Sequence, residues 1–131
     1  MSEFVCLLVI VSFLVVGFTA AEKPKLVPLP KTTDSYEKKN YRLLCSIESG
    51  DPPFTFKWSK DNQPLRESQQ LRIKIGYDDD EGSSLLTIKN LTSTDSGTFT
   101  CQVANAFGSD QSSSLLRVKG LLLFVNKMRR S

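Results

Sequence analysis

The sequence predicts an all-β domain, and three observations lead to this fold class. Apolar and polar residues alternate in six runs between residues 41 and 119. Residues typical of turns separate many of these runs, at a spacing of roughly 8–12 residues. No stretch after residue 22 has a sustained helical period. Alternation of this kind is typical of antiparallel strands that bury one face of a sheet.

Each alternating run is expected to be one strand. Because side chains point to opposite faces in turn along a strand, the apolar set of each run shares one face and forms the core. Turn-forming residues 50–53 and 61–64 separate the first three runs. The inward residues are Leu43, Cys45 and Ile47 in 41–49; Phe54, Phe56 and Trp58 in 54–60; Leu71, Ile73 and Ile75 in 70–75; Leu86 and Ile88 in 83–91; Phe99, Cys101 and Val103 in 98–103; and Leu116 and Val118 in 112–119.

The first 21 residues predict a secretory signal peptide. Residues 4–18 are apolar with two exceptions, and residues 19–21 are small. This run is short for a membrane span and suits the apolar region of a leader. Cleavage is expected between Ala21 and Glu22, which leaves a domain over residues 22–119. The leader carries the acidic Glu3 and no basic residue, so an uncleaved N-terminal anchor is the alternative.

The cysteine content predicts one disulfide. Removal of the leader takes Cys6 with it and leaves Cys45 and Cys101, both inward-facing. Two cysteines in an exported domain favour a bridge over a metal site. A pair of buried free thiols is the alternative if the chain is not exported. Trp58, the only tryptophan, follows Cys45 by 13 residues, and its large apolar ring is expected to cover the sulfurs.

Several motifs together resemble an immunoglobulin domain of the I-set, over about residues 24–119. They are Cys45, Trp58, Leu86, the run Asp95-Ser96-Gly97-Thr98-Phe99-Thr100-Cys101, and the run Ala104-Asn105-Ala106-Phe107-Gly108. The resemblance implies an immunoglobulin-like antiparallel β-sandwich with one inter-sheet disulfide. The wording of residues 51–65 and 83–108 is most similar to arthropod Down syndrome cell adhesion molecules.

The resemblance also implies local roles. Asp95 and Gly97 would shape the tight corner before the strand of Cys101, where Asp95 accepts local N–H bonds or pairs with a base such as Arg72. Gly108 would serve the next hairpin at positive φ. Phe99 stands where the family has a tyrosine, so the corner lacks the hydroxyl that normally bonds to the main chain.

Most chemistry of catalysis is excluded by composition. The chain has no histidine, which removes Ser-His-Asp and Cys-His arrangements and imidazole metal ligands. There is no glycine-rich phosphate loop. Residues 22–119 hold 14 basic and 13 acidic side chains, a net charge of +1 with no clustered stripe in the sequence, so nucleic acid and heparin are not indicated. We predict no enzyme, no cofactor and no metal.

Three weaker signals remain. Residues 78–82, which hold four acidic side chains, suggest either a Ca²⁺ site or, as we favour, a solvated turn. Asn90 begins a glycosylation sequon with Leu91 and Thr92 and is a candidate site of modification, although an inward Leu91 and a tight corner would hinder the transferase. The tail 120–131 has five apolar residues in a row, too few to span a bilayer, and suggests a truncated continuation, a disordered end or a surface-seeking segment.

The function that follows is binding of protein partners outside the cell. By resemblance the role would be cell–cell recognition or adhesion, in neural wiring or arthropod immunity, with a second copy of the chain among the partners. A structural spacer in a larger receptor or matrix protein, without a partner of its own, is the alternative. No nucleic acid or small-molecule substrate is expected, and membrane attachment only through a full-length parent protein.

Overall fold

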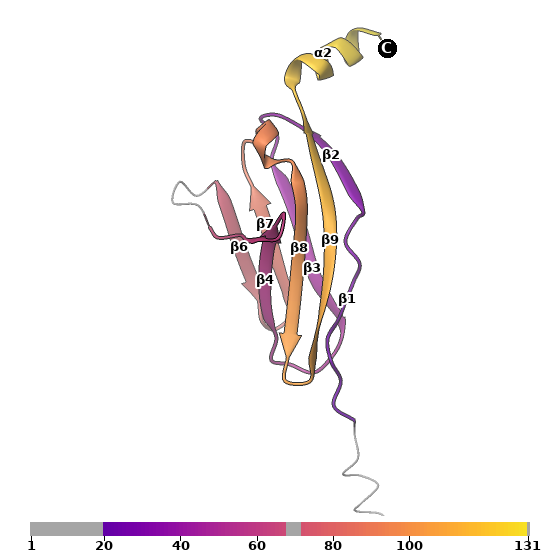
Figure 1. The fold of residues 1–131 in the computed structure, drawn as a ribbon, viewed down its shortest axis with the longest axis vertical. Coiled ribbons are helices and arrows are strands. Elements are labelled where there is room, and N and C mark those ends of the chain that lie inside the picture. The colour runs from indigo at the N-terminus through magenta and orange to yellow at the C-terminus, as the bar shows by residue number, and fades with distance from the viewer. Residues whose placement is uncertain (1–19, 68–71, 131) are drawn as a thin grey trace, which may run out of the picture.

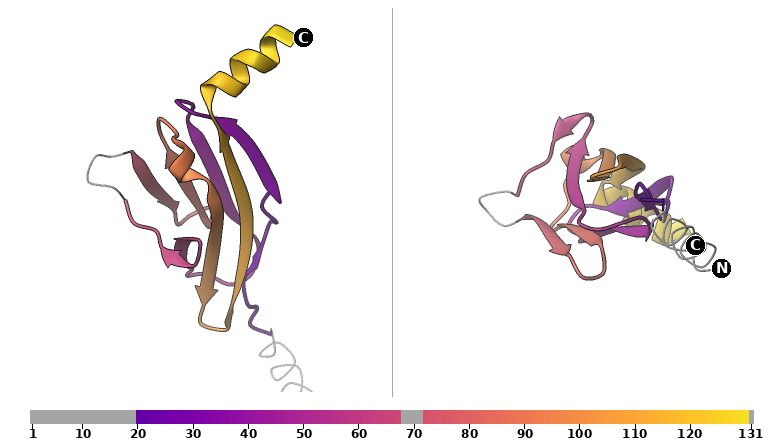
Figure 2. Two further views of the ribbon diagram at one scale, coloured as in Figure 1. Left: turned by 45° about the horizontal axis from the view of Figure 1, so that its top comes forward. Right: turned by 90° about the horizontal axis from the view of Figure 1, so that it is seen from below.

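The computed structural model describes residues 20–67 and 72–130, and two packed sheets form the body of the domain (Figures 1 and 2). One sheet has the strand order β1-β3-β7-β6, and the other β2-β9-β8-β4-β5. The all-β sandwich is therefore confirmed. The strands are β1 (Lys25–Leu26), β2 (Thr32–Tyr36), β3 (Tyr41–Ser49), β4 (Thr55–Lys60), β5 (Gln63–Pro64), β6 (Ile73–Asp78), β7 (Ser83–Ile88), β8 (Gly97–Asn105) and β9 (Gly108–Lys119), and a 3₁₀ turn η1 (Ser93–Asp95) precedes β8.

Strand β2 is an element that the alternation did not predict. It pairs in parallel with β9, whereas the other strand pairs are antiparallel. Its sequence, TTDSY, is largely polar and half-exposed because it lies at the edge of its sheet. The Arg117 Nε donates to Asp34 Oδ1 at 2.8 Å between these register partners. Strand β2 is therefore held in the sheet by its pairing with β9 and not by the burial of one of its faces.

Strand β6 runs further than predicted. The predicted run 70–75 becomes Ile73–Asp78, and Leu71 lies outside the described residues. Pairing with β7 continues in register from Ile73 opposite Ile88 to Asp78 opposite Ser83. The ladder therefore passes through Gly76, beyond the point where the apolar alternation ends.

The core lies between the two sheets. Its buried side chains come from the inward positions of the predicted runs, with Leu26, Leu29, Tyr41 and Leu91 added. In β7 every second residue is buried, which is the pattern expected of a strand with one face inside. Phe54, Ile47, Ile73, Ile75 and Val118 are partly buried at its margins.

The hairpin between β8 and β9 is built differently from the expectation. Gly108 does not have a positive φ, so that prediction is wrong. Instead the Asn105 Oδ1 accepts hydrogen bonds from the backbone N–H groups of Phe107 at 2.8 Å and Gly108 at 3.0 Å. A side-chain amide that bonds its own turn in this way removes the need for a left-handed glycine. The Asn105 Nδ2 also donates to the carbonyl oxygens of Glu22 and Asp51.

Residues 121–130 form a helix, α2 (Leu121–Arg130), which the sequence analysis did not predict. Figure 1 shows it beyond the end of the sandwich that carries η1. No helix in the described part of the chain is long and apolar enough to cross a membrane.

We expect the sandwich to be independent of α2. Deletion of residues 120–131 should leave the free energy of unfolding within about 0.5 kcal/mol of its starting value, because the helix lies beyond the end of the sandwich. Denaturant unfolding of the two chains measures this difference. A larger loss would mean that the tail packs on the domain in solution.

Candidate interaction surface

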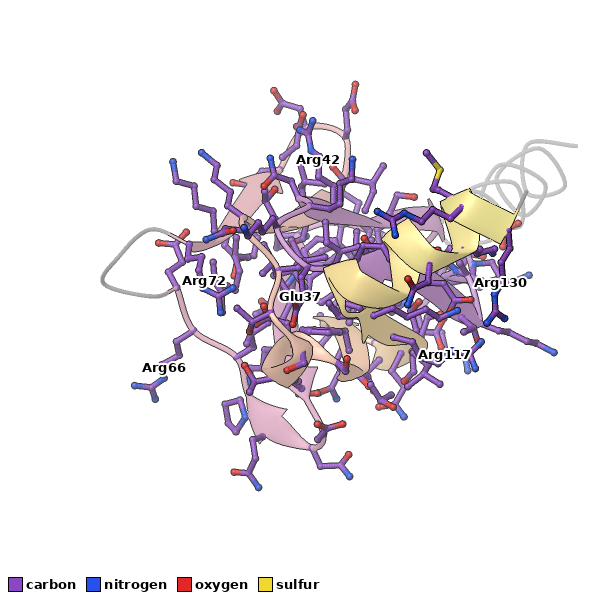
Figure 3. The ribbon with its side chains drawn as sticks, turned by 90° about the horizontal axis from the view of Figure 1, so that it is seen from above. Glu37, Arg42, Arg66, Arg72, Arg117 and Arg130 are labelled. Carbon is purple, nitrogen blue, oxygen red and sulfur yellow. A yellow bond between two sulfur atoms is a disulfide. The ribbon has the colours of Figure 1, made fainter. Side chains whose placement is uncertain are left out.

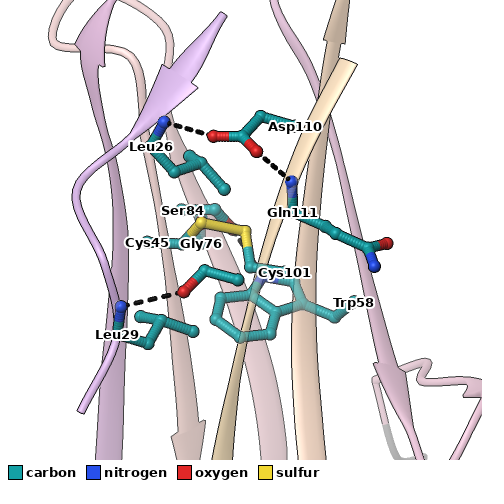
Figure 4. The surroundings of a disulfide bond; sticks show 10 residues. Leu26, Leu29, Cys45, Trp58, Gly76, Ser84, Cys101, Asp110 and Gln111 are labelled. Atoms are coloured by element: carbon teal, nitrogen blue, oxygen red, sulfur yellow. Dashed lines mark hydrogen bonds between the residues drawn. A yellow bond between two sulfur atoms is a disulfide. The ribbon is translucent and has the colours of Figure 1, made fainter. Parts of the chain in front are cut away.

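The predicted bridge between Cys45 on β3 and Cys101 on β8 is present and joins the two sheets. Both residues are fully buried, and their Cα atoms lie 6.4 Å apart. Trp58 lies against the bridge in Figure 4 and is only 4% exposed. Its strand partner is Cys101 itself.

A hydrogen bond that the sequence analysis missed lies beside the bridge. The Trp58 Nε1 donates to Ser84 Oγ at 2.8 Å, and that hydroxyl donates to the Gly76 carbonyl at 3.0 Å. Ser84 is the strand partner of Cys45. Two neighbouring pairs, one covalent and one hydrogen-bonded, therefore cross the same gap between the sheets. The sequence could have indicated this bond, because Ser84 lies at an inward position of an apolar run and a buried hydroxyl requires a hydrogen-bond partner.

We expect Ser84→Ala to destabilise the domain by about 1–3 kcal/mol, since it leaves the buried indole N–H without an acceptor. Denaturant unfolding should show a lower midpoint. Ser113→Ala, at an outward position of β9, is the matched control and should change stability by less than about 0.5 kcal/mol. Equal effects of the two substitutions would contradict a special role for the buried hydroxyl.

Asp95 and Arg72 form the ion pair that the sequence suggested. The guanidinium binds the carboxylate with two bonds, Nη1 to Oδ2 at 2.7 Å and Nη2 to Oδ1 at 2.8 Å. The Thr92 N–H donates to the same carboxylate at 2.8 Å. Burial alone would raise the pKa of Asp95, but the Arg72 guanidinium and the Thr92 donors hold it below its ordinary value. The pair links β6 to the corner before β8.

Gly97 has φ +156°, a backbone conformation that residues with a side chain rarely adopt. A Cβ atom there would lie 2.6 Å from Asp61 Oδ2 and 2.9 Å from Lys60 Cε. Asp61 also accepts a bond from the Thr98 N–H at 2.9 Å. The glycine thus lets the turn between β4 and β5 approach the start of β8. Phe99, two residues on, is 1% exposed and packs near the Tyr41 ring, with centroids 6.2 Å apart.

Asn90 and the acidic turn lie on the surface. Asn90 is exposed with φ +54°, while the adjacent Leu91 is buried. Glycosylation of Asn90 remains a prediction. Residues 78–81 are exposed, and the Glu81 N–H donates to Asp78 Oδ1 within the turn. Among the described residues no group of three or more acidic, cysteine or histidine side chains is placed to hold a metal ion.

The predicted core and corner residues thus make contacts within the domain, and the outer faces of the sheets are the surfaces open to other molecules. The outer face of β4, β8 and β9 has an open hollow lined mainly by uncharged polar residues, together with Trp58, Pro64 and one lysine, Lys57. On the other sheet Leu44 is 56% exposed and pairs with Leu85, which in turn pairs with Gly76. We call Leu44, Leu85 and Gly76 the leucine row. The sequence held the signal for it, because Leu44 and Leu85 fall at outward positions of their runs.

Comparison with known proteins identifies the family. A model of the immunoglobulin I-set domain matches residues 24–118. The chain belongs to the immunoglobulin I-set family. It is 32% identical over 101 residues to cell adhesion molecule Dscam2 of Drosophila melanogaster, a match of 77% of this chain and 5% of that protein. Leucine-rich repeats and immunoglobulin-like domains protein 3 of Mus musculus is 31% identical over 96 residues, 69% of this chain and 8% of that protein.

The fold is also similar to solved structures of titin. The I-band fragment I67–I69 gives a TM-score of 0.68 at 31% identity, over 76% of this chain and 34% of that one. Domains similar to this one therefore occur both in an adhesion molecule and in titin. The chain spans less than a tenth of the two curated relatives named above.

Proposed function

We propose that this I-set chain is an extracellular protein-binding module of the adhesion type. The leucine row is the observation that carries the proposal. It places two leucines side by side on an outer sheet face, on strands whose alternation otherwise points their apolar residues inward. Single exposed leucines are ordinary on protein surfaces, but adjacent ones in the middle of a sheet mark a contact site more often.

A sheet face suits a protein partner rather than a small ligand. The bridge, the tryptophan and the Asp95–Arg72 pair are all engaged in holding the sandwich together. The hollow on the opposite face is open to solvent, unlike the enclosed pockets that hold small molecules. An adhesion role is further supported by the similarity to Dscam2, and export by the predicted leader.

The experiment is a cell-binding assay with beads that carry the chain. We expect beads to bind either cells that display the same chain or cells of the tissue that expresses it. Beads that carry Leu44→Asp should bind fewer cells, because a charge placed in an apolar contact must be desolvated. Beads that carry Lys57→Glu, on the opposite sheet face, serve as the control. Absence of binding to both kinds of cell would overturn the proposal.

A structural spacer is the second candidate, favoured by the similarity to titin. A spacer holds its neighbours apart through its own stability and needs no exposed contact. It predicts that neither the chain nor its Leu44→Asp variant binds cells above background. The same assay therefore separates the two functions. The narrower roles in neural wiring and arthropod immunity remain expectations from resemblance.

A further inference from the structure

The outer face of the sheet β1-β3-β7-β6 has opposite charges at its two ends. Lys74 on β6 lies two residues from the leucine row on one side, and Asp78 lies two residues from it on the other. The same polarity continues past the ends of β7. Lys89, just after β7, is on the side of Lys74, and Glu81, in the turn before β7, is on the side of Asp78. All four are exposed, and none forms an ion pair among the described residues.

The spacing of the two charges within β6 is symmetric about the leucine row. Lys74 and Asp78 each lie two residues, or about 6.7 Å, from Gly76. Arg42, the partner of Thr87 in β3, adds a further cation on the basic side, in the same row as Lys74. Figure 3, which views the domain from above, shows Arg42 and Arg117 on different sides of the domain.

From this pattern we propose that the face pairs with the same face of a second copy of this chain. A two-fold axis along the leucine row would lay β3, β6 and β7 of one copy on the same strands of the other, running in opposite directions. Such an isologous contact repeats each pairing twice. Lys74 of one copy then faces Asp78 of its partner, the basic end of one copy lies over the acidic end of the other, and the leucines meet at the centre.

Gly76 supports a close approach at that centre. Its φ is not positive, and a Cβ there would meet nothing nearer than the Leu85 carbonyl oxygen at 4.0 Å. Neither backbone strain nor packing within the domain therefore requires a glycine. A glycine inside a strand weakens it and often marks a place where another chain comes near. Here the missing side chain uncovers Leu85 beside the exposed Leu44.

The inference rests on the proposed function, since it names the partner and the face of the same binding module. Its test is a charge exchange followed by sedimentation of the full chain. Lys74→Glu alone and Asp78→Lys alone should each weaken self-association at least about tenfold, because each sets like charges opposite one another at two places. Lys57→Glu, on the outer face of the other sheet, is the matched control and should behave as the parent chain does.

The decisive step is to mix the two weakened variants. At positions 74 and 78 the Lys74→Glu copy offers two acidic side chains, and the Asp78→Lys copy offers two basic ones. Both contacts then join opposite charges, and a mixed dimer should form. The double variant Lys74→Glu with Asp78→Lys should likewise regain self-association. Added salt should weaken both dimers through screening. Equal unfolding midpoints for all variants would show that the exchange acts between copies and not on the fold.

Three results would overturn the inference. The first is that the parent chain stays monomeric at its highest soluble concentration. The second is that the single variants associate as strongly as the parent chain, and the third is that the mixture of the two variants fails to dimerise. None of these refutes the proposed function, because a different protein could bind the same module through either face. That function fails separately, if beads bind neither kind of cell.

Discussion

Replacement of both Cys45 and Cys101 by alanine is expected to destabilise the domain by about 4 kcal/mol. The bridge closes a loop with a sequence separation of 56 residues. On the chain-entropy model, loss of the cross-link returns to the unfolded chain the freedom that a loop of this length had removed. A domain of this size has a total stability of about 5–15 kcal/mol, so the loss is a large fraction of it.

Denaturant unfolding tests this expectation in two ways. The midpoint should fall, and the slope of the free energy with denaturant should rise, because an unfolded chain without the bridge exposes more surface. The parent protein unfolded in the presence of a reductant is the control and should approach the same midpoint. A loss below about 1 kcal/mol would contradict the entropic account and leave the packing of the sheets as the main source of stability.

Most of the fold could be predicted from the alternation of apolar and polar side chains along each strand. The inward sets around Cys45, Trp58 and Phe99 could be predicted because period-2 patterning is visible within a single strand. Strand β2 could not be predicted in this way, since it is held by hydrogen bonds to β9, which follows it by more than 70 residues. Helix α2 was missed for a different reason, because it is too short to display a repeated helical period.

The candidate surface was harder to predict than the core. Lys74 is an isolated charge in the sequence, Asp78 belongs to an acidic run that was interpreted as a solvated turn, and the net charge of the domain is close to zero. Only the register of β6 with β7 reveals that Lys74 and Asp78 lie on opposite sides of the leucine row. The leucine row could have been found earlier, because Leu44 and Leu85 break the alternation of their own runs.

Asp95→Ala is expected to cost about 3 kcal/mol. The substitution removes the carboxylate that accepts two hydrogen bonds from the Arg72 guanidinium and one from the Thr92 N–H. Removal of one member of a buried pair is costly because the other charge stays behind without compensation. Here the Arg72 side chain is 31% exposed, so water recovers part of that cost. The Thr92 N–H at the N-terminus of η1 loses its capping acceptor, which adds about 1 kcal/mol. Asp34→Ala breaks the exposed pair with Arg117 and is the matched control, at about 0.5 kcal/mol or less.

The pH dependence of this effect distinguishes charge from packing. The pKa of Asp95 is lowered in the folded domain, so its carboxylate contributes stability that is present above the unfolded pKa of about 3.9 and is lost as pH falls through the folded pKa. The difference in unfolding free energy between the parent chain and Asp95→Ala should therefore be full at neutral pH and shrink as the solution is acidified below about pH 4. Chemical denaturation at a series of pH values measures it. A difference that stays constant into strong acid would mean that the carboxylate acts through its shape and not through its charge, and the ion pair with Arg72 would then contribute little.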